Sequence, residues 1–267
     1  MKIITKISVQ KQAGRYNIDL DNQFAFGVSE SVLIKYGLAK GRELDDDLIA
    51  DIKLSDEVAK AMRVALNYLG HSLRTIKQVQ QKMNDKEIPE QVQLQVISQL
   101  KAQHYLDDLN YALHYVATKK TINPKGPIVI KMALKQAGVS DINIEEALAT
   151  YTDEEQIIVA TQLAKKAAVT YKRESTRSKR QKIIAALATK GFSFDMAQNA
   201  VSHLAAEHDD QSELENIQRE ADKLWRRYHR DDNSKRQFKT KKGLYTKGYT
   251  SDLIDSVLAN LMLEDDK

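Results

Sequence analysis

One pattern recurs through most of this sequence and limits what the chain can fold into. Each copy has a helix-starting Ser, Thr or Pro near its beginning, followed by the apolar spacing of an α-helix. The copies are EIPEQVQLQVISQL (87–100), GVSDINIEEAL (138–148), GFSFDMAQNAVSHL (191–204) and GYTSDLIDSVLANL (248–261). Two more amphipathic helices are predicted ahead of each copy. The chain is therefore predicted to form tandem units of three helices, in which each unit buries a small core and contacts mainly its neighbours.

The N-terminal residues follow a different period. Polar and apolar residues alternate in ITKISVQ, RYNIDL and FAFGV, with the turn residues KQAG and Asp21-Asn22 between these runs. This alternation predicts a small β-meander of two hairpins. A short helix is predicted over SESVLIKYGL, and the acidic stretch GRELDDDLIADI is predicted to lead into another short helix. Its aspartates 45–47 could bind a cation, but a solvated helix start is the favoured interpretation.

The predicted fold class is mainly α: tandem three-helix repeats in an elongated, curved array, preceded by a small N-terminal β-meander element. Gly138, Gly191 and Gly248 are expected to end the middle helices of the later repeats in the left-handed conformation. The predicted boundaries are 1–54 for the N-terminal element, 55–106 for repeat 1, 107–152 for repeat 2, 153–208 for repeat 3 and 209–267 for repeat 4.

Composition and motifs argue against several classes of protein. No apolar run approaches the roughly 18 residues that a membrane-spanning helix needs, and the alternating N-terminus lacks the apolar core of a signal peptide. The absence of cysteine excludes disulfides and thiolate metal sites, and it fits a cytoplasmic protein. There is no P-loop, GxGxxG, GxSxG or HExxH motif, and NPKGP (123–127) is better explained as a turn between helices than as a phosphate loop. We predict no enzymatic activity, no cofactor and no metal.

Two adjacent aspartates, Asp107 and Asp108, lie between His104 and His114 in HYLDDLNYALHYV and could indicate a metal site or an acid–base pair. Consecutive side chains point about 100° apart on a helix, so the two carboxylates cannot readily hold one ion. The favoured interpretation is structural. One of the two is expected to cap the first helix of repeat 2 and to fix the angle at which repeat 2 leaves repeat 1.

Positive charge is concentrated in the C-terminal half of the chain and recurs where the first helix of a repeat is joined to the second. Such a stripe of cations suits a polyanion or a nucleoprotein filament, although the same residues could simply be solvated loops. Trp225, Tyr228 and Phe238 could stack on bases, but a place in the core is favoured for Trp225 and Phe238. The candidate contact residues are Lys119, Lys120, Lys125, Lys172, Arg173, Arg177, Lys179, Arg180, Arg226, Arg227, Lys235, Arg236, Lys239, Lys241 and Lys242.

Several short motifs, in this order and spacing, resemble the RecX family of recombination regulators. In repeat 1 they are LxYLxxS (66–72), KM (82–83), PE (89–90), VIxxL (96–100) and YLDD (105–108). The later repeats carry KGP (125–127), KGF (190–192) and KGY (247–249), and the N-terminal region resembles the leader of the longer, Gram-positive members. Two turns depart from this pattern, because repeat 1 has KEIPEQ without the glycine and repeat 2 has QAGVSD without the aromatic residue.

The resemblance implies a cytoplasmic, non-enzymatic modulator that binds the RecA–DNA filament. It would restrain strand exchange, ATP hydrolysis and the co-protease activity that triggers the SOS response. The implied partners are the RecA filament and its DNA, with no membrane, and a monomer is expected. Two alternatives stay open: a stand-alone helical DNA-binding protein, since three-helix units can place a helix in the major groove, and a general helical-repeat adaptor whose partner does not involve DNA.

Overall fold

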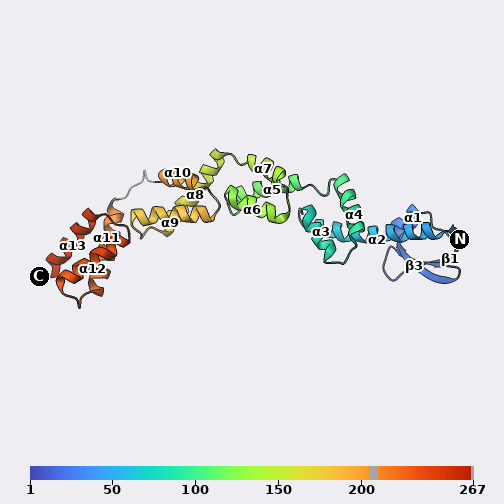
Figure 1. The fold of residues 1–267 in the computed structure, drawn as a ribbon, viewed down its shortest axis with the longest axis horizontal. Coiled ribbons are helices and arrows are strands. Elements are labelled where there is room, and N and C mark those ends of the chain that lie inside the picture. Colours follow the sequence, from blue (N-terminus) through green and yellow to red (C-terminus); the bar gives the residue numbers. More distant parts are fainter. Residues whose placement is uncertain (205–209, 266–267) are drawn as a thin grey trace. The chain divides into compact units, whose positions relative to one another are not determined.

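The computed structural model describes residues 1–204 and 210–265. The chain divides into two compact units, one made of residues 1–113 and 134–145 and the other of residues 114–133 and 146–267. Figure 1 shows a small sheet at the N-terminus followed by helices throughout the rest of the described chain. The predicted fold class is confirmed in its elements: a β-meander precedes three-helix repeats. The elongated, curved shape stays a prediction.

The N-terminal sheet has four antiparallel strands in the order β3-β2-β1-β4. The strands are β1 (Lys2–Val9), β2 (Arg15–Leu20), β3 (Gln23–Ser29) and β4 (Glu43–Leu44). Asp21 and Asn22 join β2 to β3 with φ values of 50° and 70°, as a tight two-residue hairpin requires. Ile4, Ile18 and Val28 are fully buried on one face. The alternation that predicted the strands therefore reflects a sheet with one buried face.

The prediction that the acidic stretch leads into a short helix is wrong. After α1 (Glu30–Lys35), the acidic stretch begins a single long helix, α2 (Asp46–Leu69), and the predicted boundary between residues 54 and 55 falls inside it. Asp45 caps α2 by accepting a hydrogen bond from the Leu48 amide. No glycine or proline follows to stop the helix before Gly70. The first half of α2 packs against the sheet and the second half helps to form the core of repeat 1.

A buried ion pair ties α2 to the sheet. The guanidinium of Arg15 in β2 donates to both carboxylate oxygens of Asp56 at 3.2 and 3.0 Å, and the Ser29 amide donates to the same carboxylate at 2.8 Å. Burial by itself would raise the pKa of Asp56, but the hydrogen bonds from Arg15, Lys60 and Ser29 outweigh it and hold that pKa below its ordinary value. Asp56 is therefore charged and fully partnered at neutral pH.

The repeats follow one plan of three helices each. Repeat 1 uses α2, α3 (Ile76–Asn84) and α4 (Glu90–Ala102), and repeat 2 uses α5 (Asp108–Thr121), α6 (Pro127–Ala137) and α7 (Asp141–Ala149). Repeat 3 consists of α8 (Asp153–Thr170), α9 (Thr176–Thr189) and α10 (Phe194–Ser202), and repeat 4 of α11 (Asp210–Arg227), α12 (Asn233–Thr246) and α13 (Ser251–Asp265). The predicted boundary at residues 208 and 209 lies outside the described residues.

Each middle helix ends in the same left-handed turn. Gly138, Gly191 and Gly248 have φ values of 90°, 94° and 90°, as expected. The next residue donates its amide to a carbonyl five residues back, for example Val139 to Leu134 at 3.1 Å, and its side chain is buried at 5% exposure. Phe192 and Tyr249 occupy the equivalent buried place. An apolar residue after the turn is thus what the motif needs, and valine satisfies it in repeat 2.

Repeat 1 makes this turn without glycine. Glu87 takes φ = 56°, and the Ile88 amide donates to the Met83 carbonyl at 3.1 Å, so the hydrogen bonding matches that of the other repeats. A residue with a Cβ atom is strained in this region. Replacing Glu87 by glycine is therefore expected to raise the free energy of unfolding by about 0.5–1 kcal/mol, measured by urea denaturation. The Lys86→Gly control, one residue earlier, should lower it; equal effects of the two changes would contradict the strain at Glu87.

Candidate nucleic-acid interface

Successive repeats meet where the N-terminus of one middle helix contacts the C-terminus of the next middle helix along the chain. We call this contact a joint, and each of the three joints lies within one compact unit. In the first joint, the Thr75 hydroxyl at the start of α3 donates to the Ala137 carbonyl at 2.6 Å. In the third joint, the Ser175 hydroxyl at the start of α9 donates to the Lys247 carbonyl at the same distance, 2.6 Å. Opposite ends of two helix dipoles face each other in both joints, which is favourable.

The second joint uses a backbone amide where the others use a hydroxyl. Gly126, directly before α6, donates its N–H to the Lys190 carbonyl at 2.8 Å, and the Ile128 amide donates to the Gly191 carbonyl at 3.1 Å. Pro127 is the first residue of α6 and has no N–H to satisfy. A Cβ on Gly126 would lie 2.2 Å from the Gly191 carbonyl oxygen. The two backbones are therefore in direct contact at this joint.

The joints explain why the left-handed turns of repeats 2–4 carry glycine and that of repeat 1 does not. A Cβ on Gly138 would lie 2.5 Å from the Lys77 side chain, and one on Gly191 would lie 2.6 Å from the Val129 backbone nitrogen. On Gly248 it would approach the Ser175 hydroxyl to 3.0 Å. In the described chain the N-terminal sheet and α1 precede repeat 1, so no middle helix among the described residues docks on its turn, and Glu87 is tolerated there.

Asp107 and Asp108 serve two different helices. Asp107 accepts a hydrogen bond from the Asn110 amide at 3.0 Å and caps α5. Asp108 turns away and accepts the Ile76 amide at 2.9 Å, at the N-terminus of α3 in repeat 1. No group of residues suited to a metal ion is found among the described residues. In the third joint, Glu213 of α11 accepts the Thr176 amide in the same way, at 3.2 Å. A carboxylate from the next repeat thus caps the middle helix in both joints.

The carboxylate of Asp108 is partly desolvated in this position. Burial raises its pKa, the hydrogen bond from the Ile76 amide opposes that rise, and the nearby charge of Asp107 adds to it. Replacing Asp108 by alanine leaves the Ile76 amide without an acceptor and is expected to lower the free energy of unfolding by about 2 kcal/mol. Asparagine keeps an acceptor and should largely restore stability. Urea denaturation of both variants measures the two effects.

The Asn variant also gives a pH test. A raised native pKa means that Asp108 favours folding most in its protonated form, and this contribution is lost as pH rises above the ordinary value of 3.8. The Asp108→Asn variant should therefore gain stability relative to the natural chain as pH increases from about 4 toward 7. A difference between the two chains that does not change with pH would contradict this assignment of the shift.

The loop between α8 and α9 is the best defined of the basic segments. Asn216 of α11, which is buried, donates its side-chain amide to the carbonyls of Lys172 and Glu174 at 2.8 and 3.3 Å. Arg219 donates to the Arg173 carbonyl at 3.2 Å and to the Asn216 side chain at 2.6 Å. The backbone of the loop is therefore held by repeat 4. Neither Asn216 nor Arg219 stood out in the sequence, because a single buried Asn in a polar helix leaves no pattern.

The side chains of this loop point to solvent. Lys172, Arg173, Arg177 and Arg180 are exposed and Lys179 is half-exposed. None of these side chains forms an ion pair within the described residues. The acid in the loop, Glu174, is occupied by Lys182, whose hydrogen bond holds the pKa of Glu174 below its ordinary value despite partial burial. The cations are thus presented together, and no carboxylate in the described part of the chain pairs with them.

Several other basic candidates form contacts within the protein. Lys120 pairs with Glu155 at 2.6 Å, lies over the Tyr151 ring and is little exposed. Arg236 stacks on the ring of Trp225, 4.1 Å from its centroid. Three lysines pair with neighbouring acids, namely Lys235 with Asp232, Lys239 with Asp231 and Lys241 with Asp255. The remaining candidates comprise Lys119, which lies over the Tyr115 ring, Lys125, which is half-exposed, and the exposed residues Arg226, Arg227 and Lys242.

Among the three aromatic residues near α12, the burial of Phe238 differs from the prediction. Trp225 is buried beneath Arg236, as expected, and Tyr228 packs against the core of repeat 4 with Lys239 over its ring. Phe238 was expected in the core, but it is 67% exposed. The face of α12 that packs inward is formed by Thr240 and Leu244, both fully buried, and Phe238 lies on the opposite side.

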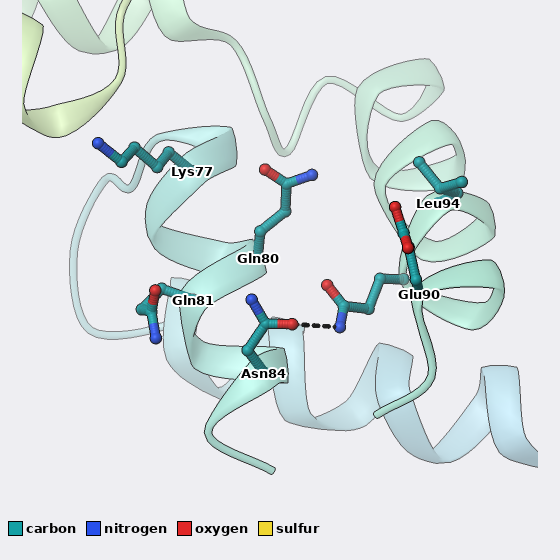
Figure 2. A pocket seen from close by; sticks show the side chains of 7 residues that line it. Lys77, Gln80, Gln81, Asn84, Glu90 and Leu94 are labelled. Atoms are coloured by element: carbon teal, nitrogen blue, oxygen red, sulfur yellow. Dashed lines mark hydrogen bonds between the residues drawn. The ribbon is translucent and has the colours of Figure 1, made fainter. Parts of the chain in front are cut away.

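Repeat 1 has a polar groove of about 370 Å³ between α3 and α4. In Figure 2, Gln80 and Asn84 of α3 face Glu90 of α4 across the groove, and Asn84 accepts a hydrogen bond from Gln93 at 2.6 Å. The lining contains one cationic residue, Lys77, and one anionic residue, Glu90, so its formal charge is zero. This groove lacks the excess of positive charge found in the α8–α9 loop and does not suit a phosphate backbone.

Comparison with known proteins places these elements in one family. Family models match residues 2–45 as the N-terminal domain of regulatory protein RecX, 61–100 as its first three-helix domain and 107–148 as its second. The third three-helix domain matches twice, at 153–201 and 211–258. Curated relatives named regulatory protein RecX are 64% identical in Leuconostoc mesenteroides, over 100% of both chains, and 38% identical in Bacillus subtilis, over 97% of this chain and 98% of the relative.

The chain belongs to the RecX family. A crystal structure of regulatory protein RecX, 38% identical in sequence, aligns with 76% of this chain and 100% of its own, with a TM-score of 0.66. A second, of RecX from Lactobacillus salivarius, aligns with 57% of this chain and 99% of its own at 38% identity and a TM-score of 0.55. The double match of the third domain means that repeats 3 and 4 share one pattern, and the same left-handed turn at Gly191 and Gly248 also indicates this.

Membership of the RecX family confirms the resemblance stated above. The chain is a regulatory protein that modulates RecA, and it is not an enzyme. None of the helices in the described part of the chain combines the length and the apolar character that crossing a bilayer requires.

Proposed function

We propose that this RecX-family chain acts in the cytoplasm as a monomer that binds the RecA–DNA filament and restrains it through direct contacts to DNA phosphates. The α8–α9 loop and the first turns of α9 are the primary contact surface. The observation that carries the proposal is the fixed loop: Asn216 and Arg219 hold its backbone, while Lys172 and Arg173 extend into solvent and pair with no acid among residues 1–204 and 210–265.

A fixed cationic loop suits a phosphate backbone for two reasons. Each phosphate neutralised by Lys or Arg releases condensed counterions, which favours binding at low salt. Because the loop backbone is already ordered, binding costs less conformational entropy than it would for a flexible loop. Arg173, Arg177 and Arg180 add planar donors that can contact two phosphate oxygens at once. These contacts position the protein on DNA without reading its sequence.

RecA-driven ATP hydrolysis on single-stranded DNA, titrated with the chain, tests the proposal. We expect inhibition that weakens steeply as salt is added. Inhibition far below one chain per RecA protomer would indicate capping of filament ends, and inhibition near equivalence would indicate filling of the groove. Tight DNA binding without any effect on RecA would instead favour a stand-alone DNA-binding protein, and the absence of both would favour a general adaptor.

A further inference from the structure

The outer face of α12 carries two aromatic side chains that the fold does not use. Phe238 is 67% exposed and Tyr245 is 63% exposed, whereas Leu244 beside them is fully buried in the core of repeat 4. Single exposed apolar residues are common, but two large ones on the same face of one helix indicate a binding surface.

The spacing of these residues places them together. Positions 238, 241, 242 and 245 lie three, four and seven residues apart and therefore share one face of a helix. Phe238 and Tyr245 are about 10 Å apart along the helix axis, and Lys241 and Lys242 lie between them. Lys242 is exposed, Lys241 forms an exposed ion pair with Asp255, and α12 contains no acidic residue. We call these four residues the aromatic–lysine face.

The scaffold does not require aromatic residues at these positions. When α9 and α12 are aligned on their terminal glycines, Gly191 and Gly248, the residues equivalent to Phe238 and Tyr245 are Gln181 and Ala188. Both are exposed in repeat 3, whose middle helix ends in the same left-handed turn as that of repeat 4. The aromatic pair is therefore an addition to repeat 4 and has no role in the shared architecture of the repeats.

We propose that the aromatic–lysine face is a stacking platform for the bases of single-stranded nucleic acid, with Phe238 and Tyr245 against the bases and Lys241 and Lys242 against the phosphates. Aromatic rings interleaved with lysines are the combination that binds single strands without sequence preference. A duplex keeps its bases stacked and out of reach. An acidic protein surface would use the lysines but has no flat rings to stack on Phe238 and Tyr245. This inference rests on the proposed function and extends it, because repeat 4 would bind the bases of single-stranded DNA as well as its phosphates.

Binding of the full chain to fluorescently labelled oligo(dT), and to an abasic strand of the same length and charge, tests this inference by fluorescence anisotropy. The Phe238→Ala/Tyr245→Ala double variant should bind oligo(dT) about 10- to 100-fold more weakly and bind the abasic strand as before. A Phe238→Leu/Tyr245→Leu variant keeps apolar side chains without rings and should show the same loss, whereas Phe238→Tyr/Tyr245→Phe should restore binding. The Lys242→Ala variant should weaken binding of both strands.

Two results would overturn the stacking platform. One is an unchanged affinity of the Ala double variant for oligo(dT), and the other is an equal loss on both strands. If the double variant binds oligo(dT) normally but no longer inhibits RecA-driven ATP hydrolysis, the face contacts protein and the proposal is wrong. Because Phe238 and Tyr245 are exposed, the thermal midpoint of the variants should match that of the natural chain. Inhibition of RecA by the natural chain is measured separately, so failure here leaves the proposed function intact.

Discussion

A chain in which four cations of the α8–α9 loop and α9 are reversed to glutamate is expected to lose inhibition of RecA-driven ATP hydrolysis. The substitutions are Lys172→Glu, Arg173→Glu, Lys179→Glu and Arg180→Glu. Each removes a possible phosphate contact and adds a repulsive charge. Affinity for the filament should therefore fall at least about 100-fold at low salt. The affected side chains have no ion-pair partners within the described residues, so the fold should be retained.

The matched control reverses four cations in another part of the chain. Lys6, Lys11, Lys40 and Arg63 are exposed in the N-terminal element and in α2, and their reversal to glutamate changes the formal charge equally. This control should inhibit RecA nearly as well as the natural chain, because long-range electrostatics between exposed charges are screened within about 10 Å at moderate salt. Equal loss in both variants would mean that net charge matters and that the loop is not the contact.

The Gly126→Ala substitution is expected to break the joint between repeats 2 and 3. The added Cβ would meet the Gly191 carbonyl at 2.2 Å, and backbone atoms cannot turn aside as a side chain can. Separating the two helices also removes the hydrogen bonds from the Gly126 and Ile128 amides to α9. The combined cost is about 2–4 kcal/mol. Thermal unfolding should show a midpoint lower by roughly 2–4 °C for each kcal/mol lost.

Gly70→Ala is the matched control for this change. Gly70 ends α2 with φ = −61°, and a Cβ there would meet only ordinary contacts at 3.5 Å and beyond. Alanine should be neutral or slightly stabilising at this position, because it restricts the unfolded chain. A Gly126→Ala chain as stable as the Gly70→Ala chain would show that the close backbone contact is not needed at the joint.

Much of the fold could be predicted because each repeat encodes its helices locally. Apolar spacing, capping residues such as Thr152 and Ser193, and the glycines at 138, 191 and 248 mark helix ends independently of the rest of the chain. The continuity of α2 could not be predicted in this way. Its two halves belong to different cores, and the aspartates that suggested a separate helix only begin it.

The places of the cations in the repeats could be predicted, but their ion-pair partners could not, and their contact with DNA or RecA stays a prediction. Repetition predicted the cations near the junction of the first and second helices in repeats 2–4, and the structure has them in these loops and in the two helices that each loop joins. Which cations have acidic partners depends on residues far along the chain, as for Lys120 with Glu155 and Lys241 with Asp255. The exposure of Phe238 also depends on the rotation of α12 in its repeat, which a short basic helix with few apolar residues does not specify.

The most direct test of the account is the salt dependence of binding to RecA assembled on single-stranded DNA. Labelled natural chain and the loop variant with glutamate at positions 172, 173, 179 and 180 are titrated against the filament over a series of salt concentrations. The affinity of the natural chain should fall steeply with salt, and the variant should show a log–log slope smaller by about 3. Filament binding that is as tight and as salt-dependent in the variant as in the natural chain would contradict a phosphate contact through this loop.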